Sequence, residues 1–240
     1  MTSAILPSTA VLLPGTGSDE VFVRAVFAGP LATLGLGLLT PAPPPGSALA
    51  GGYLTILDDL AAEHGTLLVG GISFGAHLAA EWAVRNPGRC AGLMAALPAW
   101  NGHPGQAPAS LAARLSSDLV TRSGTEAALA ASTAGVPPWL ATELTRAWRR
   151  QGDGLAASLR AAAERPAPEL SHLHALKVPA GIGACTDDPI HPPEVARQWA
   201  KALPHAALGE TTLTDLGRDR ESLGRATVLA WLRAHTTHRP

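Results

Sequence analysis

Six short apolar runs alternate along the chain with stretches in which apolar residues recur every three or four positions. The runs lie at residues 9–13, 34–39, 66–71, 90–97, 178–185 and 206–213. This alternation is typical of parallel strands joined by crossover helices. The sequence therefore predicts an α/β fold with a mostly parallel, six-stranded sheet.

Residues 100–176 interrupt this alternation, because helical patterns follow one another there without a strand pattern. The first of them carries Leu111, Leu115 and Leu119. Ligands of open α/β sheets bind at the carboxyl ends of the strands, so we expect this segment to lie over that edge as a lid. The predicted organisation is a core formed by residues 1–99 and 177–240, with a helical cap, residues 100–176, inserted in it.

The composition excludes several classes of function. Of the 240 residues, 46% are apolar and 15% are charged, which suffices for one sizeable core and argues against disorder. A net charge of −1 with scattered arginines provides no basic face for nucleic acid. No apolar run approaches the ~20 residues needed to span a bilayer, and the N-terminus lacks the basic segment of a secretion signal. Cys90 and Cys185 lie in apolar runs and are interpreted as core residues of a cytoplasmic protein.

A glycine-flanked serine joins the third apolar run to a helical pattern. Residues 69–75 read Val-Gly-Gly-Ile-Ser-Phe-Gly, with glycines two positions before and two positions after Ser73. Such glycines suit a strained strand-to-helix turn, where a Cβ atom would collide with the neighbouring backbone. The same pattern also arises by chance in a glycine-rich chain, and its alternative interpretation is a plain turn. We predict that Ser73 is a nucleophile presented on this turn.

Three motifs, in chain order, resemble those of the α/β-hydrolase superfamily, and the resemblance extends from Thr9 to His235. Residues 13–20 resemble the oxyanion loop, residues 71–77 the nucleophile elbow, and residues 185–192 the loop that carries the acid. The resemblance implies a minimal six-stranded core, because the sequence has no room for the family's two N-terminal strands.

The resemblance also implies roles for individual residues. Ser73 would be the nucleophile and Asp188 the acid, with Asp187 as the second choice for the acid. The backbone amides of Thr16 and Phe74 would form the oxyanion hole, which depends on the backbone and not on side chains.

The segment where this family carries its histidine reads Asp-Leu-Gly-Arg-Asp over residues 215–219, with Arg218 in the usual position of the base. Guanidinium, with a pKa above ~12, cannot act as a general base near neutral pH. Three interpretations are open. His191, three residues after Asp188, supplies the base. Alternatively, the pocket only binds a ligand, and Arg218 holds a ligand carboxylate or pairs with Asp188. In the third, the oxyanion hole and Arg218 support lyase, decarboxylation or cyclisation chemistry.

Four further residues lie near the predicted site. Trp100, His103 and Trp139 lie where the cap should begin or fold over, and they are interpreted as pocket walls or as cap core. His77, one helical turn beyond Ser73, projects from a helix flank and is expected to be structural.

The predicted function is hydrolysis of, or acyl transfer from, an ester or thioester through Ser73, weakened by the arginine at 218. The alternative is a non-hydrolytic member of the fold, either a ligand-binding protein or a lyase or cyclase that uses Arg218. The expected partner is a small-molecule substrate or acyl ligand, without a cofactor or a metal, and no pattern indicates the oligomeric state. We also expect a charge-assisted hydrogen bond between Asp188 and Arg218.

Overall fold

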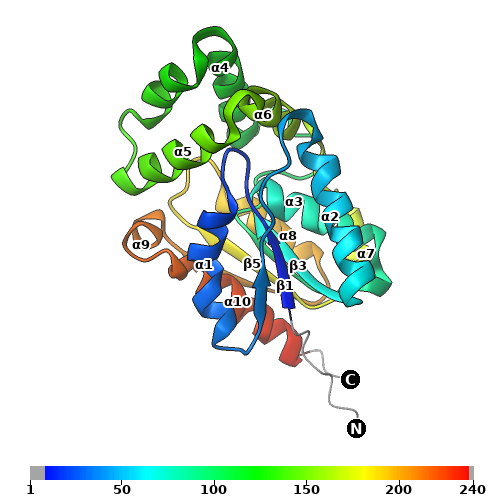
Figure 1. Ribbon diagram of the computed structural model, residues 1–240. Helices are drawn as coiled ribbons and strands as arrows, with labels where there is room; N and C mark the ends of the chain where they lie inside the picture. Colours follow the sequence, from blue (N-terminus) through cyan, green and yellow to red (C-terminus); the bar gives the residue numbers. More distant parts are fainter. Residues whose placement is uncertain (1–8, 238–240) are drawn as a thin grey trace.

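The computed structural model describes residues 9–237, which form a sheet flanked by helices (Figure 1). Its strands are β1 (Thr9–Leu13), β2 (Gly37–Leu39), β3 (Leu67–Ile72), β4 (Cys90–Ala96), β5 (Ala180–Cys185) and β6 (Ala206–Thr211). Neighbouring strands are parallel throughout, in the order β2-β1-β3-β4-β5-β6. The predicted six-stranded sheet is therefore confirmed, although most of the strands are shorter than the apolar runs.

Helices cover both faces of this sheet. One face carries α1 (Glu20–Ala32) and α10 (Glu221–Thr237), and the other carries α2 (Leu49–His64), α3 (Phe74–Arg85) and α8 (Pro193–Ala202). The short helix α9 (Leu213–Arg218) follows β6, and single 3-10 turns lie at Gly46–Ala48, Pro87–Arg89 and Gly152–Gly154.

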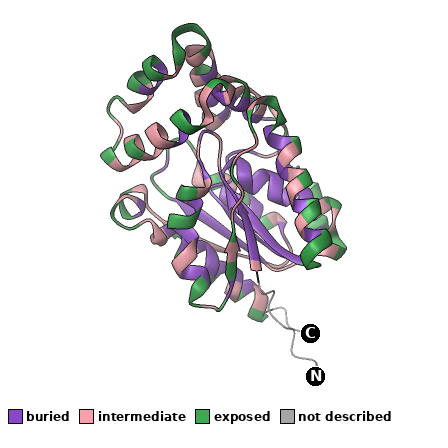
Figure 2. Ribbon diagram, viewed as in Figure 1, coloured by how far each residue is buried: buried purple, intermediate pink, exposed green. Residues whose placement is uncertain are grey.

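Alternate side chains of β1 enter two separate hydrophobic clusters. Val11 and Leu13 pack with residues of α2 and α3, whereas Ala10 and Leu12 pack with residues of α1 and α10. This follows from the two-residue period of a strand, whose successive side chains point to opposite faces. Figure 2 shows the consequence for the four central strands, β1, β3, β4 and β5, which are buried between helices that expose their outer sides.

Between β4 and β5 the chain forms α4 (Pro108–Thr133), α5 (Pro138–Gln151), α6 (Leu155–Glu164) and α7 (Leu170–Ala175). The first three, called the inserted helices below, lie beyond the carboxyl ends of the strands (Figure 1) and share a small core of their own. Helix α4 is kinked at Gly124, where φ is 80°. Helix α7 instead packs beside α3 and α8, so the end of segment 100–176 lies with the helices that cover the sheet.

Candidate active site

Ser73 occupies the turn between β3 and α3 in a strained backbone conformation. Its φ is 53° and its ψ is −116°, outside the regions that L-residues ordinarily adopt. The turn is held by the Ser73 amide, which donates to the Ala96 carbonyl of β4 at 2.8 Å. Strain of this kind persists only where the surroundings enforce it, and it directs the serine side chain away from the sheet.

The two glycines around Ser73 are required by close backbone contacts. A Cβ atom on Gly71 would lie 2.5 Å from the Leu13 carbonyl oxygen, and one on Gly75 would lie 2.2 Å from the same oxygen. Real Cβ atoms do not approach backbone this closely, so both positions exclude any side chain. The spacing seen in the sequence thus reflects the packing of β1 against the start of α3.

His191 contacts Ser73 directly, although 118 positions separate them in the sequence. The imidazole Nε2 lies 2.9 Å from the Ser73 Oγ, and the other ring nitrogen, Nδ1, lies 2.8 Å from Asp188 Oδ2. If Nδ1 carries the ring proton and donates to the carboxylate, Nε2 is an acceptor facing the serine hydroxyl. The three side chains therefore have the connectivity of a nucleophile, a base and an orienting acid.

The loop after β5 carries both Asp188 and His191. The second carboxylate oxygen of Asp188, Oδ1, accepts the backbone amides of Ile190 at 2.8 Å and His191 at 3.1 Å. Burial raises the pKa of Asp188. The hydrogen bond and charge of His191, together with the hydrogen bonds from the two amides, lower it by more, so the pKa of Asp188 lies below its ordinary value. The carboxylate is thus ionised and fixed while it orients the imidazole.

Arg218 is not part of this group, and the expected hydrogen bond between Asp188 and Arg218 is a wrong prediction. Within residues 9–237 no ion pair joins them, because the Asp188 carboxylate is occupied by His191 and two amides. The chain enters α9 soon after β6. Arg218 is the last residue of that helix and is exposed. Asp187, the second choice for the acid, accepts the Leu213 amide at 2.6 Å and so ties the start of α9 to the β5 loop.

The two residues whose amides are predicted to form an oxyanion hole each follow a residue at the serine turn. Phe74 is the first residue of α3, and Thr16 follows Gly15, whose added Cβ would lie 3.4 Å from the Ser73 Cβ. In the described part of the chain neither amide donates a hydrogen bond to another protein group. Two amides without a protein acceptor are free to bind an anionic oxygen, which the N-terminus of α3 also favours.

His77 lies one turn beyond Ser73 and contacts Ala99, Trp100 and Trp199. Its Nε2 accepts the Ala99 amide at 2.9 Å, and its ring lies between those of Trp100 and Trp199, with centroids at 4.5 and 5.7 Å. Complete burial and the charge of His191 lower the pKa of His77 to about 3. His77 is therefore a neutral, packed histidine.

The three residues named as pocket walls lie in different environments. Trp100 packs against His77 in a small apolar cluster, and His103 is exposed. Trp139, on α5, stacks on Phe22 of α1 and lies under the guanidinium of Arg220. Trp139 thus links the inserted helices to α1 and to the residues after α9.

Neither a membrane span nor a metal site is found in the part of the chain that the structure describes. No helix there is long and apolar enough to cross a bilayer. No three His, Cys, Asp or Glu side chains among residues 9–237 are grouped so that they could hold a metal ion.

Comparisons with solved structures identify the fold. The sequence matches no protein-family model and no curated protein. MenH from S. aureus superposes with a TM-score of 0.73 at 17% identity, over 98% of this chain and 96% of that one. The enol-lactonase from Burkholderia xenovorans LB400 gives 0.71 at 18%, over 95% and 92%. A thermophilic esterase from Thermogutta terrifontis gives 0.66 at 20%, over 94% and 89%. The chain has the α/β-hydrolase fold.

Proposed function

We propose that this protein hydrolyses a carboxylic ester or thioester, with Ser73 as the nucleophile, His191 as the general base and Asp188 as the group that orients His191. The proposal rests above all on the 2.9 Å distance between His191 Nε2 and Ser73 Oγ. A base must lie within hydrogen-bond reach of the proton that it removes, and this one does. Of the three interpretations of Arg218, the geometry favours the one in which another histidine supplies the base.

In the acylation step, the Ser73 oxygen attacks the substrate carbonyl carbon while its proton moves to His191 Nε2. The carbonyl oxygen becomes an anion, which the amides of Thr16 and Phe74 would stabilise. The imidazolium then donates its proton to the departing alcohol or thiol as the carbon–oxygen or carbon–sulfur bond breaks. The acyl group stays on Ser73 as an ester.

In the deacylation step, water takes the place of the serine. His191 Nε2 removes a proton from the water, and the resulting hydroxide attacks the acyl carbonyl carbon. Collapse of the second tetrahedral anion releases the carboxylic acid, and the proton on His191 returns to the Ser73 oxygen. Asp188 stays ionised throughout and stabilises the imidazolium, in keeping with its lowered pKa. Besides the substrate and one water molecule, each step uses only Ser73, His191, Asp188 and the two backbone amides.

The comparisons support this class of reaction without identifying the substrate. Two of the similar structures bear the names esterase and enol-lactonase, enzymes that cleave the ester bond in open or cyclic form. As part of the proposal, the inserted helices act as a cap over the site and the substrate is a small molecule. The alternatives, a ligand-binding protein or a lyase, require Arg218 to act in the pocket. They receive no support from the structure, because Arg218 is exposed.

Labelling with a fluorophosphonate probe tests the proposal, because this reagent reacts with an activated serine whatever the natural substrate. We expect wild-type protein to be labelled, Ser73→Ala not to be labelled, and His191→Ala to react at least about 10³-fold more slowly. His64→Gln, which alters an exposed histidine at the end of α2, is the matched control and should label at the wild-type rate. Equal labelling of His191→Ala and wild type would refute the assignment of the base.

A further inference from the structure

Helix α5 contacts Gly17, Ser18 and Asp19 of the loop that follows β1, and also Glu20, the first residue of α1. A Cβ atom on Gly17 would lie 2.8 Å from the indole Nε1 of Trp148, so this helix packs directly on the loop backbone. The Ser18 carbonyl accepts a hydrogen bond from Gln151 at 3.3 Å, and Asp19 and Glu20 form ion pairs with arginines of the same helix. The second half of the loop, residues 17–19, is thus held by one inserted helix.

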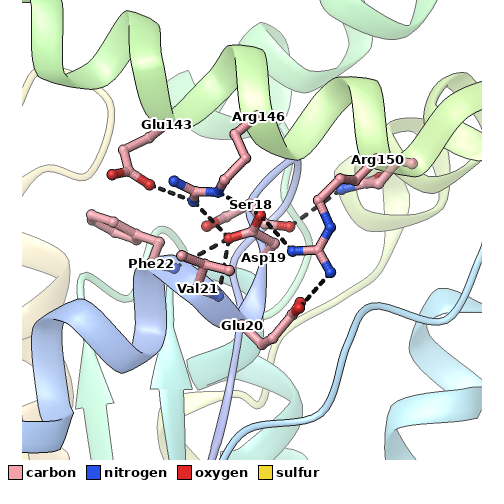
Figure 3. A network of polar contacts seen from close by, with 9 residues as sticks. Ser18, Asp19, Glu20, Val21, Phe22, Glu143, Arg146 and Arg150 are labelled. Atoms are coloured by element: carbon pink, nitrogen blue, oxygen red, sulfur yellow. Dashed lines mark hydrogen bonds and ion pairs between the residues drawn. The ribbon is translucent and has the colours of Figure 1, made fainter.

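Asp19 is the centre of these contacts (Figure 3). Arg146 donates to both of its carboxylate oxygens, from Nη2 to Oδ1 at 2.7 Å and from Nε to Oδ2 at 2.9 Å. Arg150 makes the third arginine hydrogen bond to this carboxylate, from Nη1 to Oδ2 at 3.2 Å, and it also forms an ion pair with Glu20. Glu143 contacts Arg146 from the preceding turn of α5.

The same carboxylate also begins α1. Asp19 Oδ1 accepts the amides of Val21 and Phe22, both at 3.1 Å, and so caps the helix. Asp19 is only 2% exposed. Burial raises the pKa of Asp19, but the hydrogen bonds from Arg146 and Phe22 and the charges of Arg146 and Arg150 outweigh that effect and lower it. Asp19 is therefore a buried carboxylate, ionised and saturated with donors.

The position of this cluster in the chain gives it a consequence for catalysis. Thr16, whose amide faces the oxyanion in the proposed mechanism, lies three residues before Asp19 in the same loop. Gly15 abuts the Ser73 side chain, and the Ser18 amide closes the turn onto the Gly15 carbonyl at 3.1 Å. A donor misplaced by about 1 Å loses on the order of 10²-fold in rate, so the loop must be held rigidly.

We propose that Asp19 is a positioning residue, which holds the Thr16 amide beside Ser73 by tying the loop after β1 to Arg146 and Arg150 of helix α5. This inference rests on the proposed hydrolase function and extends it. Helix α5 is then a structural part of the oxyanion hole, and the loop and the inserted helix move as one unit.

Two variants remove the tie and one serves as its matched control. Asp19→Asn keeps an oxygen that can cap α1, since asparagine caps helices as well as aspartate does, but it removes the charge that Arg146 and Arg150 bind. Arg146→Gln removes the tie from the other side. Arg149→Gln is the control, because Arg149 lies on the same helix and makes the same two-bond pair, but with Glu126 of α4 and not with the loop.

The first readout is the split between kcat and KM for p-nitrophenyl acetate. We expect Asp19→Asn and Arg146→Gln to lower kcat by about 10- to 100-fold with KM within about twofold, since an oxyanion donor acts mainly in the transition state. Arg149→Gln should stay within about twofold of wild type in both. An equal loss of kcat in Arg149→Gln, or a rise in KM at unchanged kcat, would overturn the proposal.

The second readout, amide hydrogen exchange of the peptide that contains residues 15–18, does not depend on turnover. We expect exchange there to be at least about tenfold faster in Asp19→Asn and Arg146→Gln than in wild type and Arg149→Gln. Unchanged exchange and unchanged kcat in an active enzyme would overturn the positioning role alone. A wild-type protein without Ser73-dependent turnover would instead overturn the proposed hydrolase function, and with it the catalytic role of Asp19.

Discussion

The carboxylate of Asp188 and the imidazole of His191 lie three residues apart on one loop, with Asp188 Oδ2 2.8 Å from His191 Nδ1. The proposed acid and base are therefore positioned by a single segment between β5 and α8. The segment is stiffened by Pro189 and Pro192, whose rings restrict the backbone φ angle, and Pro193 begins α8. The Asp188 oxygen that does not face the imidazole accepts backbone amides of the same segment, so Asp188 holds the loop as well as the imidazole.

Replacing Asp188 by asparagine should abolish most of the activity without unfolding the protein. Asparagine keeps an oxygen for the Ile190 and His191 amides, but its NH₂ group facing Nδ1 favours the wrong tautomer of the imidazole. We expect kcat for an aryl ester to fall by about 10³- to 10⁴-fold. Thermal unfolding followed by circular dichroism provides the control for folding. A loss of less than tenfold would show that Asp188 does not orient the base.

His77 should make stability depend on pH below neutrality. Its pKa is about 3 in the folded protein and 6.5 in the reference state, so the unfolded chain binds more protons at pH values between the two. Stability is therefore fully present above about pH 6.5 and declines as the pH falls towards 3. We expect His77 to account for a loss of about 2 kcal/mol in the free energy of unfolding between about pH 7 and pH 5.

Urea unfolding of wild type and His77→Gln at these two pH values measures that contribution. The loss between pH 7 and pH 5 should be smaller in His77→Gln by about the same 2 kcal/mol, whatever the substitution costs at pH 7. Identical pH dependence in the two proteins would show that His77 is not buried as a neutral side chain.

Gly75 should tolerate no side chain, whereas Gly88 should tolerate one. A Cβ on Gly75 would lie 2.2 Å from the Leu13 carbonyl oxygen, and a Cβ on Gly88 would have no heavy atom within 4 Å. We expect Gly75→Ala to lower the free energy of unfolding by about 2 kcal/mol or more, and Gly88→Ala to change it by less than about 0.5 kcal/mol. Denaturant titration measures both, and equal stability of the two variants would contradict the packing at the serine turn.

The strands were largely predictable because their signal is local. All six apolar runs form strands, yet β2 begins only at Gly37. The backbone amides of Leu34 and Leu36 both donate to the Leu31 carbonyl, and Gly35 between them has a φ of 69°. These residues therefore form the turn that ends α1 and do not start the strand. Apolar character does not distinguish a helix end from a strand, and this accounts for the difference.

The inserted helices were predicted in type but not in orientation. Leu115, part of the leucine pattern in α4, is 67% exposed, whereas Ser110, Ala113 and Ser117 of the same helix are buried. Ser110 and Ser117 donate to carbonyls of α6, which lets two helices approach closely through small residues. Sequence periodicity favours large apolar residues for the buried face, so this contact gave no signal.

The site was predictable only as far as its motifs are local. The glycine spacing indicated the turn at Ser73, because the turn's own geometry requires it. The contact between His191 and Ser73 joins positions 118 apart, and that between Arg146 and Asp19 joins positions 127 apart. Contacts at this separation depend on strand order and helix placement, which no local pattern encodes. For the base, sequence reasoning could therefore only name His191 among alternatives.

Arg218→His should leave the hydrolysis of an aryl ester within about twofold of wild type. A sequence that lacks only the usual histidine predicts that restoring it raises the rate at least about tenfold. The structure reverses that expectation, because His191 already contacts both Ser73 and Asp188. Arg218 is exposed at the end of α9, and among residues 9–237 no hydrogen bond or ion pair joins it to Ser73 or Asp188. The measurement is kcat/KM for p-nitrophenyl acetate.

The double variant His191→Ala with Arg218→His makes this test decisive. If position 218 cannot reach the site, the double variant should be as inactive as His191→Ala alone, at least about 10³-fold below wild type. Recovery of activity in the double variant would place residue 218 within reach of Ser73. Position 218 would then be a site from which a histidine can act as the base. An unchanged rate in His191→Ala alone would remove His191 from the mechanism. Only loss of activity in His191→Ala, without rescue from position 218, agrees with a base carried by the loop after β5.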